Sequence, residues 1–300
     1  MDEIAERIGG LKKKLNAVIV AHNYQRPEVQ DIADFCGDSL ELARKCTETD
    51  AEVIVFCGVH FMAESAAILN PRKMVLLSEA DAGCPMADMI SGDKLREWKA
   101  RYPGATVVCY INSSAEVKAE SDYCCTSANA VKLVESIDAE DILFVPDKNL
   151  GHYVSTKVNK NIIVYPGCCP PHDRVTPEQV KLARQNYPQA QFVVHPECVP
   201  GVVAMADAVL STSQMIRYVK ESEADTFVIG TEQELLYRLR KDNPEKSFYV
   251  LSPSLICPNM KKTTIDSVVK TMELKRNVIT VPEEVRLRAK RALDRMLAVV

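Results

Sequence analysis

The stretch "NAVIVAHNY" at residues 16–24 decides the fold, because two further stretches of the same kind follow it. They are "ATVVCYINS" at residues 105–113 and "AQFVVHPEC" at residues 190–198. Each is a short, largely β-branched apolar run, typical of a buried parallel strand, and each ends in two polar side chains two residues apart. The pairs are His22 with Tyr24, Tyr110 with Asn112, and His195 with Glu197. This pattern indicates a structural unit that occurs three times.

Other landmarks recur in the same order. Three cysteines that precede proline, Cys84, Cys169 and Cys257, follow the first members of the polar pairs by 62, 59 and 62 residues. Between them, an aspartate stands five residues before a hydroxyl side chain in each unit: Asp34 and Ser39, Asp122 and Ser127, Asp207 and Thr212. Further apolar runs come at residues 52–58, 141–147 and 226–232. A period near 85 residues is too long for a solenoid repeat, so we interpret the chain as a triplicated domain.

The order of elements within each unit predicts an α/β fold. Helix and strand patterns alternate, which implies a small parallel sheet with right-handed crossovers and helices on both faces. We therefore expect three similar αβα, Rossmann-like domains in a pseudo-threefold triangular arrangement. The predicted domains are residues 1–88 with Cys84, residues 89–173 with Cys169 and residues 174–264 with Cys257. Helices near residues 2–15 and 282–298 stand outside the repeat and are expected to pack on the first domain, to which we assign residues 265–300.

Composition limits the classes of protein that fit. The 300 residues are 47% hydrophobic and 26% charged, as in an ordinary globular protein, and a net charge of −4 argues against nucleic acid as a partner. The sequence predicts neither a signal peptide nor an apolar segment of about 20 residues, so we expect no membrane span. Eleven cysteines without a CxxC spacing argue against a zinc ribbon or a thioredoxin motif and favour a reducing, cytoplasmic location.

The three Cys-Pro pairs predict a cofactor. Ligands bind beyond the carboxyl ends of parallel strands, and threefold packing of the domains can bring three such edges together. Zinc prefers four ligands, whereas a [4Fe–4S] cluster can be held by three cysteines with one iron open as a Lewis acid. Cys169 is favoured over Cys168 because only Cys169 precedes proline. A fourth cysteine would have to break the symmetry, and the candidates for it are Cys124, Cys125, Cys168 and Cys198.

The hydroxyl residues and the polar pairs predict a substrate site. Ser39, Ser127 and Thr212 each precede a helical pattern, as N-caps or first-turn residues, and plain capping is the simpler interpretation of any one of them. Three helix N-termini around one axis would suit a substrate with several anionic groups, and Asp38 lies beside the first. Histidine paired with phenol or carboxylate suits proton transfer. His172 is either a support of the cluster or structural, whereas His60 and His152 are expected to be structural.

In combination, several motifs resemble quinolinate synthase. They are "AHNYQRPEVQDIADFCGDSLELA", "GVHFMAE", "CPMAD", "YINSSAE", "CTSANA", "PDKNLG", "HPEC" and "CPNMKK", in order from about residue 17 to residue 262. The resemblance implies three αβα domains with pseudo-threefold symmetry and a [4Fe–4S] cluster on three cysteines. It also implies condensation of iminoaspartate with dihydroxyacetone phosphate to quinolinate, phosphate and water, in NAD biosynthesis. Functional coupling to an enzyme that produces iminoaspartate is a further expectation.

The same resemblance implies roles for individual residues. The cluster ligands would be Cys84, Cys169 and Cys257. Substrate would contact His22, Ser39, Tyr110, Ile111, Asn112, Ser127, His195, Pro196, Glu197 and Thr212. Asp38 is added to this set because of its position beside Ser39. Catalytic roles would fall to Glu197 and Tyr24 in acid–base and enolisation steps, together with His22, His195 and Tyr110. The chain departs from the usual family pattern at Cys168 and Ser213, which bear on the choice of cluster ligand and on access to the third helix N-terminus.

Three other interpretations fit parts of the sequence. One is a different [4Fe–4S]-dependent hydro-lyase that acts on a small hydroxy acid. A second is an electron carrier or iron sensor without catalytic activity, and a third is a metal-free scaffold with buried cysteines. Motifs for nicotinamide, nucleoside triphosphate or serine-hydrolase chemistry are missing from the sequence.

Overall fold

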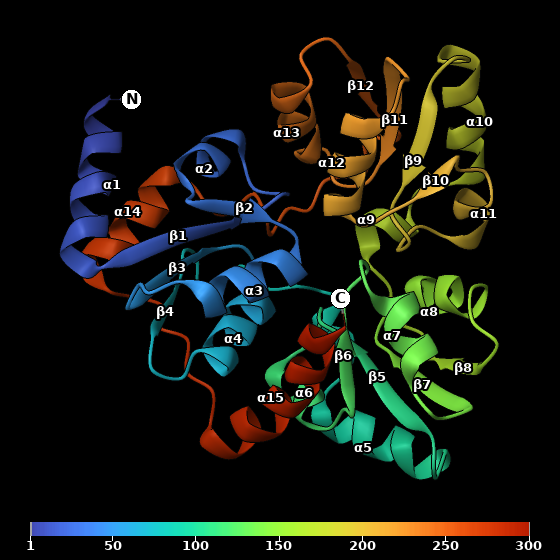
Figure 1. Cartoon of the computed structure of the whole chain (residues 1–300), viewed down its shortest axis with the longest axis horizontal. Coiled ribbons are helices and arrows are strands. Elements are labelled where there is room, and N and C mark those ends of the chain that lie inside the picture. The colour runs from blue at the N-terminus through green and yellow to red at the C-terminus, as the bar shows by residue number, and fades with distance from the viewer. Residues whose placement is uncertain (1, 300) are drawn as a thin grey trace.

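The computed structural model describes residues 2–299 and shows three lobes around a common centre, each built on one parallel sheet (Figure 1). All three sheets have four strands in the same order, in which the first strand of the unit lies between the second and the third. The predicted fold class, three similar αβα units in a triangular arrangement, is confirmed. The exact domain boundaries given above remain a prediction.

The first sheet has the order β2–β1–β3–β4, formed by β1 (Ala17–His22), β2 (Phe35–Gly37), β3 (Val53–Cys57) and β4 (Met74–Leu77). The helices in this part of the chain are α1 (Asp2–Leu15), α2 (Pro27–Ile32), α3 (Ser39–Glu48), α4 (His60–Leu69) and the short 3-10 helix η1 (Ala87–Met89). Every residue of β3 is buried, because helices cover both faces of a parallel sheet and leave no face for water.

The second sheet repeats this order with β5 (Thr106–Tyr110), β6 (Tyr123–Cys125), β7 (Asp141–Val145) and β8 (Asn161–Val164). Its helices are α5 (Gly92–Arg101), α6 (Ala115–Ala119), α7 (Ala130–Ser136), α8 (Lys148–Ser155) and α9 (Pro170–Asp173). The third sheet contains β9 (Gln191–Val194), β10 (Ala208–Val209), β11 (Thr226–Gly230) and β12 (Ser247–Val250). Its helices are α10 (Pro177–Asn186), α11 (Pro200–Val203), α12 (Thr212–Glu221) and α13 (Leu235–Asp242).

The recurring aspartates Asp34, Asp122 and Asp207 are structural. Each carboxylate accepts a hydrogen bond from a backbone N–H near the start of the first strand of its own unit. The three donors are Ile19 at 2.8 Å, Val107 at 2.9 Å and Phe192 at 2.7 Å. These bonds fix the edge strand against the first strand in every unit. The aspartate of the repeated motif therefore serves the fold, and only its hydroxyl partner is left for a site.

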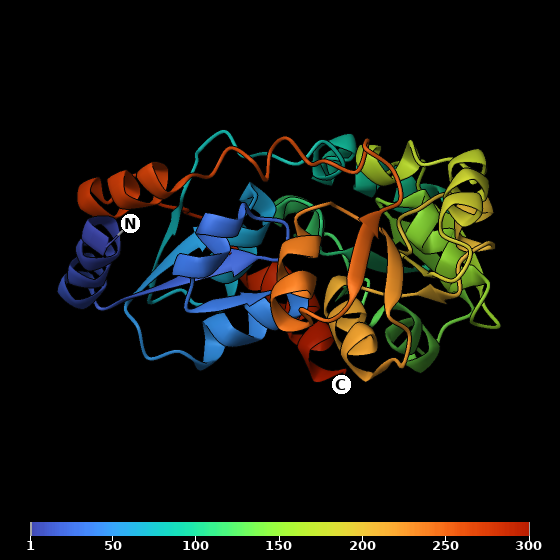
Figure 2. The ribbon, with the colours of Figure 1, turned by 90° about the horizontal axis from the view of Figure 1, so that it is seen from above.

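The two C-terminal helices pack on different units. Helix α14 (Ile265–Leu274) lies beside α1 and contacts β3 and β4, at one end of the elongated molecule (Figure 2). Helix α15 (Glu283–Ala298) packs mainly on α6 and β6 and also touches α4. Arg288 pairs with Glu120 at 2.8 Å, and Asn129 donates to the carbonyl of Met296 at 3.2 Å. The expectation that α15 packs on the first domain holds only for its contact with α4, because its main contacts are with α6 and β6 of the second unit. Its apolar face therefore covers the seam between the first and second units.

The strands of the three units point their carboxyl ends toward the centre of the molecule, as Figure 1 shows for β1, β5 and β9. Polar contacts cross between units at this centre. Asn23, after β1, donates to Thr212 Oγ1 of α12 at 3.0 Å, and the Tyr110 hydroxyl at the end of β5 donates to Glu197 Oε1 at 2.7 Å. Side chains far apart in the sequence therefore share one space.

Candidate active site

One cavity of about 70 Å³ lies where the three units meet. Within residues 2–299, its lining includes all the predicted site residues except Ile111 and Pro196. The predicted residues that line it are His22, Tyr24, Asp38, Ser39, Cys84, Tyr110, Asn112, Ser127, Cys169, His195, Glu197, Thr212 and Cys257. Ile111 instead borders a smaller adjoining void beside Ser39, and Pro196 is buried. The roles of these residues remain predictions, but the fold brings almost all of them together.

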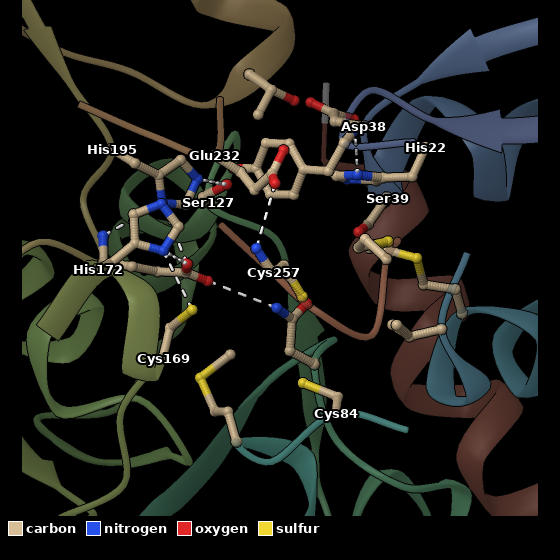
Figure 3. Close-up of a pocket in the computed structure, with 18 of the residues that line it drawn as sticks. His22, Asp38, Ser39, Cys84, Ser127, Cys169, His172, His195, Glu232 and Cys257 are labelled. Carbon is tan, nitrogen blue, oxygen red and sulfur yellow. Dashed lines mark hydrogen bonds and ion pairs between the residues drawn. The ribbon is translucent and has the colours of Figure 1, made fainter. Parts of the chain in front are cut away.

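The three Cys-Pro cysteines contribute one thiol from each unit to this cavity, and their sulfur atoms point into it (Figure 3). They lie close enough to interact electrostatically. Burial, and then the neighbouring Cys257, raise the pKa of Cys84 to about 12. Burial, Glu197 and Cys84 raise the pKa of Cys169 well above its ordinary value. Three converging soft donors fit a metal centre that prefers thiolate.

The turns that follow Cys84 and Cys257 donate backbone hydrogen bonds to the thiol in the same way, and the turn that follows Cys169 differs from them. The backbone N–H groups of Met86 and Ala87 hydrogen-bond to the Cys84 thiol, and those of Asn259 and Met260 do the same for Cys257. These donors stand two and three residues after the cysteine.

In the second unit the residue two after Cys169 is Pro171, which has no N–H to donate. The imidazole of His172 lies there instead, with Nδ1 3.1 Å from Cys169 Sγ. His172 is thus a neighbour of the predicted ligand rather than a distant structural residue.

Cys168 does not point into the cavity. Its thiol hydrogen-bonds to Asp173, and its backbone N–H points to the sulfur of Met89 at 3.3 Å. The other cysteines considered as a fourth ligand are Cys124, Cys125 and Cys198, all buried, and none of the four lines the cavity in the described part of the chain. The geometry therefore favours Cys169 over its neighbour.

Glu197 is the best-connected acid in the cavity. Its carboxylate accepts from the Tyr110 hydroxyl at 2.7 Å and lies 2.8 Å from His172 Nδ1 and 3.5 Å from His195 Nδ1. Burial alone would raise the pKa of Glu197, but His195, His172 and the Tyr110 hydroxyl hold it below its ordinary value. Glu197 is therefore an ionised base that is almost fully buried, with the Tyr110 hydroxyl and His172 Nδ1 within hydrogen-bond distance.

A chain of hydrogen bonds connects Glu197 to Tyr24 on the opposite wall. His172 Nε2 lies 2.9 Å from Thr231 Oγ1, and that hydroxyl lies 2.5 Å from the hydroxyl of Tyr24. With His172 Nδ1 on Glu197, the path runs Tyr24–Thr231–His172–Glu197. Sequence reasoning missed Thr231. The signal was available, because Thr231 follows β11 directly, and polar residues after a parallel strand face the ligand edge.

His22 and His195 repeat one local arrangement. The Nδ1 atom of each ring accepts from the backbone N–H two residues later, that of Tyr24 at 3.1 Å and that of Glu197 at 3.3 Å. The neutral rings therefore carry their proton on Nε2, and His195 Nε2–H donates to Ser127 Oγ at 3.1 Å. The Nε2–H of His195 is thus taken up by Ser127, whose own hydroxyl hydrogen remains available to donate.

Both histidines should make stability depend on pH. Burial and the neighbouring His195 lower the pKa of His22 from 6.5 to about 3, and burial lowers the pKa of His195 from 6.5 to about 4. Below pH 6.5 the unfolded chain binds protons that the folded chain refuses, so the free energy of unfolding should fall as the pH drops from about 6.5 toward 4. Denaturant unfolding of the iron-free protein should show a loss on the order of a few kcal/mol.

His195→Gln should weaken this pH dependence, whereas His152→Gln, outside the cavity, should leave it intact. If the free energy of unfolding fell equally steeply with pH in the His195 variant and in the unmodified protein, the assignment of a neutral His195 in the folded state would be contradicted.

The hydroxyl residues are not the helix caps. Asp38 caps α3 by accepting from Leu40 and Glu41 N–H at 3.0 Å, and Ser211 caps α12. Ser39 and Thr212 are the first residues of these helices, as one of the two expectations had it. Before α7 the N-cap position belongs to Asn129, and Ser127 lies in the preceding turn. Asp38 and Ser211 cap α3 and α12, whereas Asn129 makes no side-chain cap bond at α7, and all three hydroxyl residues line the cavity.

One acceptor in the cavity has no partner. Asn112 Oδ1 is buried and makes no hydrogen bond among the described residues, although its Nδ2 lies 3.5 Å from Glu197 Oε1. An unsatisfied buried carbonyl costs about 1–3 kcal/mol, so a bound molecule with an N–H or O–H donor would be favoured here.

A metal ion could be held at one place on the wall. Cys169, His172 and Glu197 bring three ligand atoms within 4.8 Å of one another.

Among residues 2–299, no helix has both the length and the apolar character that crossing a membrane requires.

Comparison with known proteins gives one family. A family model described as quinolinate synthetase A protein matches residues 6–298. A quinolinate synthase of Dehalococcoides mccartyi strain CBDB1 is 56% identical over 297 residues, which make up 99% of this chain and 98% of the relative. One from Geobacter sp. strain M21 is 56% identical over 292 residues, 97% of this chain and 96% of the relative. Quinolinate synthase 1 of Methanosarcina acetivorans is 53% identical over 297 residues, 99% of this chain and 98% of the relative.

Proposed function

The chain belongs to the quinolinate synthetase A family, and we propose that it condenses iminoaspartate with dihydroxyacetone phosphate to give quinolinate, phosphate and water. Membership of this family makes the protein an enzyme of NAD biosynthesis. One observation beyond the family match carries the proposal. Three thiols, one from each unit, converge on a cavity whose other walls hold three buried carboxylates, two tyrosines and four hydroxyl residues.

The cofactor we assign is a [4Fe–4S] cluster on Cys84, Cys169 and Cys257, with one iron free of protein ligands. The donor set supports this assignment, since these are the three cysteine thiols in the cavity lining of the described chain. When bound, such a cluster supplies a Lewis acid that can polarise a hydroxyl of the substrate. His172 donates a hydrogen bond toward Cys169 or Glu197 and so links the cluster wall to the acid–base groups.

Substrate binding follows from groups that face the cavity. The hydroxyls of Ser39, Ser127 and Thr212, with the neutral Nε2–H group of His22, offer donors to carboxylates and phosphate, and the Nε2–H of His195 supports Ser127. The free carbonyl of Asn112 offers an acceptor to an imine or amine N–H. Neutral donors bind anions without the strong electrostatic hold of arginine, which suits intermediates that must rearrange within one cavity.

Proton transfer is assigned to Glu197 and Tyr24. Glu197 is held ionised and accepts a proton from a C–H group of the substrate, while the Tyr110 hydroxyl stabilises the carboxylate through its hydrogen bond at 2.7 Å. The path through His172 and Thr231 lets that proton reach the Tyr24 hydroxyl, which can deliver it to a departing hydroxyl group. Burial closes the path to bulk water.

The setting of the enzyme is part of the same proposal. All eleven cysteines are free thiols, which supports a reducing, cytoplasmic compartment. Iminoaspartate hydrolyses readily, so supply by a functionally coupled enzyme that produces it is expected.

The test is an assay of anaerobically purified protein for quinolinate, with iminoaspartate and dihydroxyacetone phosphate supplied together. We expect about four iron and four sulfide per chain, and product only when both substrates are present. A spectrum perturbed by a substrate analogue but no quinolinate would favour another hydro-lyase. An unperturbed cluster would favour an electron carrier or sensor, and colourless protein would leave only the scaffold.

A further inference from the structure

Asp147 and Glu232 are two buried carboxylates that have no part in the proposed reaction. They occupy the same position in their units, two residues after the ends of β7 and β11, and lie 85 residues apart. Asp147 is 0% exposed and Glu232 is 1% exposed. In the first unit the equivalent position, two residues after β3, is Val59. Buried carboxylates are costly, so each must be held by specific contacts.

Both carboxylates make the same two connections. One oxygen accepts from the helix that follows: Leu150 N–H to Asp147 Oδ1 at 2.8 Å, and Glu234 N–H to Glu232 Oε2 at 2.9 Å. The other accepts from the backbone N–H of a predicted cluster ligand, Cys169 to Asp147 Oδ2 at 3.1 Å and Cys257 to Glu232 Oε1 at 3.2 Å. Each acid therefore joins the start of a helix to a cysteine that comes after the next strand.

A backbone hydrogen bond at the same place is common to all three units. The N–H of the residue after each equivalent position donates to the carbonyl two residues before the cysteine. The pairs are His60 to Ala82 at 2.8 Å, Lys148 to Gly167 at 2.8 Å and Gln233 to Leu255 at 2.9 Å. The acids add a second connection to the loops of Cys169 and Cys257. Val59 has no side-chain acceptor and cannot make it for Cys84.

The segments joined by Asp147 are in close contact. A Cβ atom on Gly167 would lie 2.5 Å from the carbonyl oxygen of Pro146, so only glycine fits beside this segment. A hydrogen bond to the N–H of a residue holds the peptide plane that precedes it, and so holds the position of the Cα atom from which the side chain starts. Contacts to the N–H of Cys169 and Cys257 therefore help to place two of the three thiols.

We propose that Asp147 and Glu232 are positioning residues that hold Cys169 and Cys257 ready to bind the iron–sulfur cluster. The inference rests on the proposed function, because it takes these cysteines as ligands. Groups around metal ligands orient them, and their loss costs about 10–100-fold in metal affinity or activity. The three units therefore differ here: the loops of Cys169 and Cys257 are each held by a carboxylate, whereas the loop of Cys84 is not.

Glu232 extends this role to the first unit. Lys261 Nζ lies 2.9 Å from Glu232 Oε1 and donates to the backbone carbonyl of Tyr24 at 2.6 Å. The Cys257 loop is in this way attached to the turn that carries Tyr24. Loss of the Glu232 charge should therefore disturb the position of Tyr24 as well as that of Cys257.

The test uses the isosteric amides Asp147→Asn and Glu232→Gln in the full chain. Each amide keeps one acceptor oxygen and replaces the other with an NH₂ donor. The NH₂ group must then face either the helix N–H or the cysteine N–H, so that one donor faces another and a hydrogen bond is lost. The matched control is Asp207→Asn, which alters a carboxylate that also accepts a backbone N–H, at 2.7 Å, but does not line the cavity. All proteins are reconstituted anaerobically with ferrous iron and sulfide.

We expect both amide variants to release iron to a chelator about 10-fold faster than the control and the unmodified protein. The iron-free variants should unfold within about 5 °C of the iron-free control, since each loses an acceptor for a backbone N–H, and Asp207 and Glu232 also each lose an ion pair, with Arg184 and Lys261. Because iron release is measured without turnover, the result does not depend on activity.

Iron release at the rate of the control from either variant would overturn the assignment for that residue. Faster release accompanied by an equally large loss of stability in the iron-free protein would also overturn it, because the carboxylate would then support the whole unit and not the cysteine. If the unmodified protein binds no cluster at all, the proposed function fails first. If it binds one and the variants keep it, only this inference fails.

Discussion

Replacing Cys169 with serine should abolish the iron–sulfur signal and reduce quinolinate formation by more than about 100-fold, since even loss of an outer partner costs about 10–100-fold. The side chain points into the cavity beside Cys84 and Cys257, and with two remaining thiols the site offers too few soft donors for a stable cluster (Figure 3). The measurements are iron and sulfide per chain after anaerobic reconstitution, the visible absorption, and product formed from both substrates.

The chain supplies a matched control at the adjacent position. Cys168→Ser makes the same chemical change one residue away, on a thiol that hydrogen-bonds to Asp173 and lies outside the cavity. This variant should keep its iron content and its activity. Loss of the cluster in Cys168→Ser with retention in Cys169→Ser would reverse the ligand assignment.

Glu197→Gln should lower kcat by about 100-fold to 10,000-fold while leaving the cluster in place, the range typical of loss of a general base. Glutamine fills the same space and can still accept from the Tyr110 hydroxyl, but it cannot take a proton from substrate. The hydrogen-bond path to Tyr24 through His172 and Thr231 also loses its ionised end. Steady-state kinetics with the iron content measured on the same samples would separate this effect from loss of the cluster.

Glu64→Gln is the comparison for this second prediction. Glu64 accepts the N–H of Ala115 at 3.0 Å and lies outside the lining of the site, so its neutral variant should turn over substrate nearly as well as the unmodified enzyme. Wild-type kcat in Glu197→Gln would contradict its role as base. An equal loss in both variants would point to a general effect of removing a carboxylate.

The triplication could be predicted from the sequence because each unit needs apolar runs for its buried parallel strands and polar residues directly after those strands for the site. Both requirements leave a pattern that recurs along the chain. Apolar runs of five or six residues, an aspartate that anchors the edge strand and a cysteine before proline recur in one register. Local pattern was also enough to choose Cys169 over Cys168. The position of α15 was not predictable in this way, since an amphipathic helix outside the repeat can cover any apolar seam.

The sequence by itself determined the three-unit α/β fold and most of the polar residues that line the cavity, because strand periodicity and position after a strand are local properties. Only the tertiary structure decided which groups touch. The path Tyr24–Thr231–His172–Glu197 joins three units, and the hold of Asp147 and Glu232 on the cysteine loops spans 22 and 25 residues. Hydrogen bonds depend on distances of a few tenths of an ångström between side chains that packing brings together, and no pattern along the chain encodes those distances.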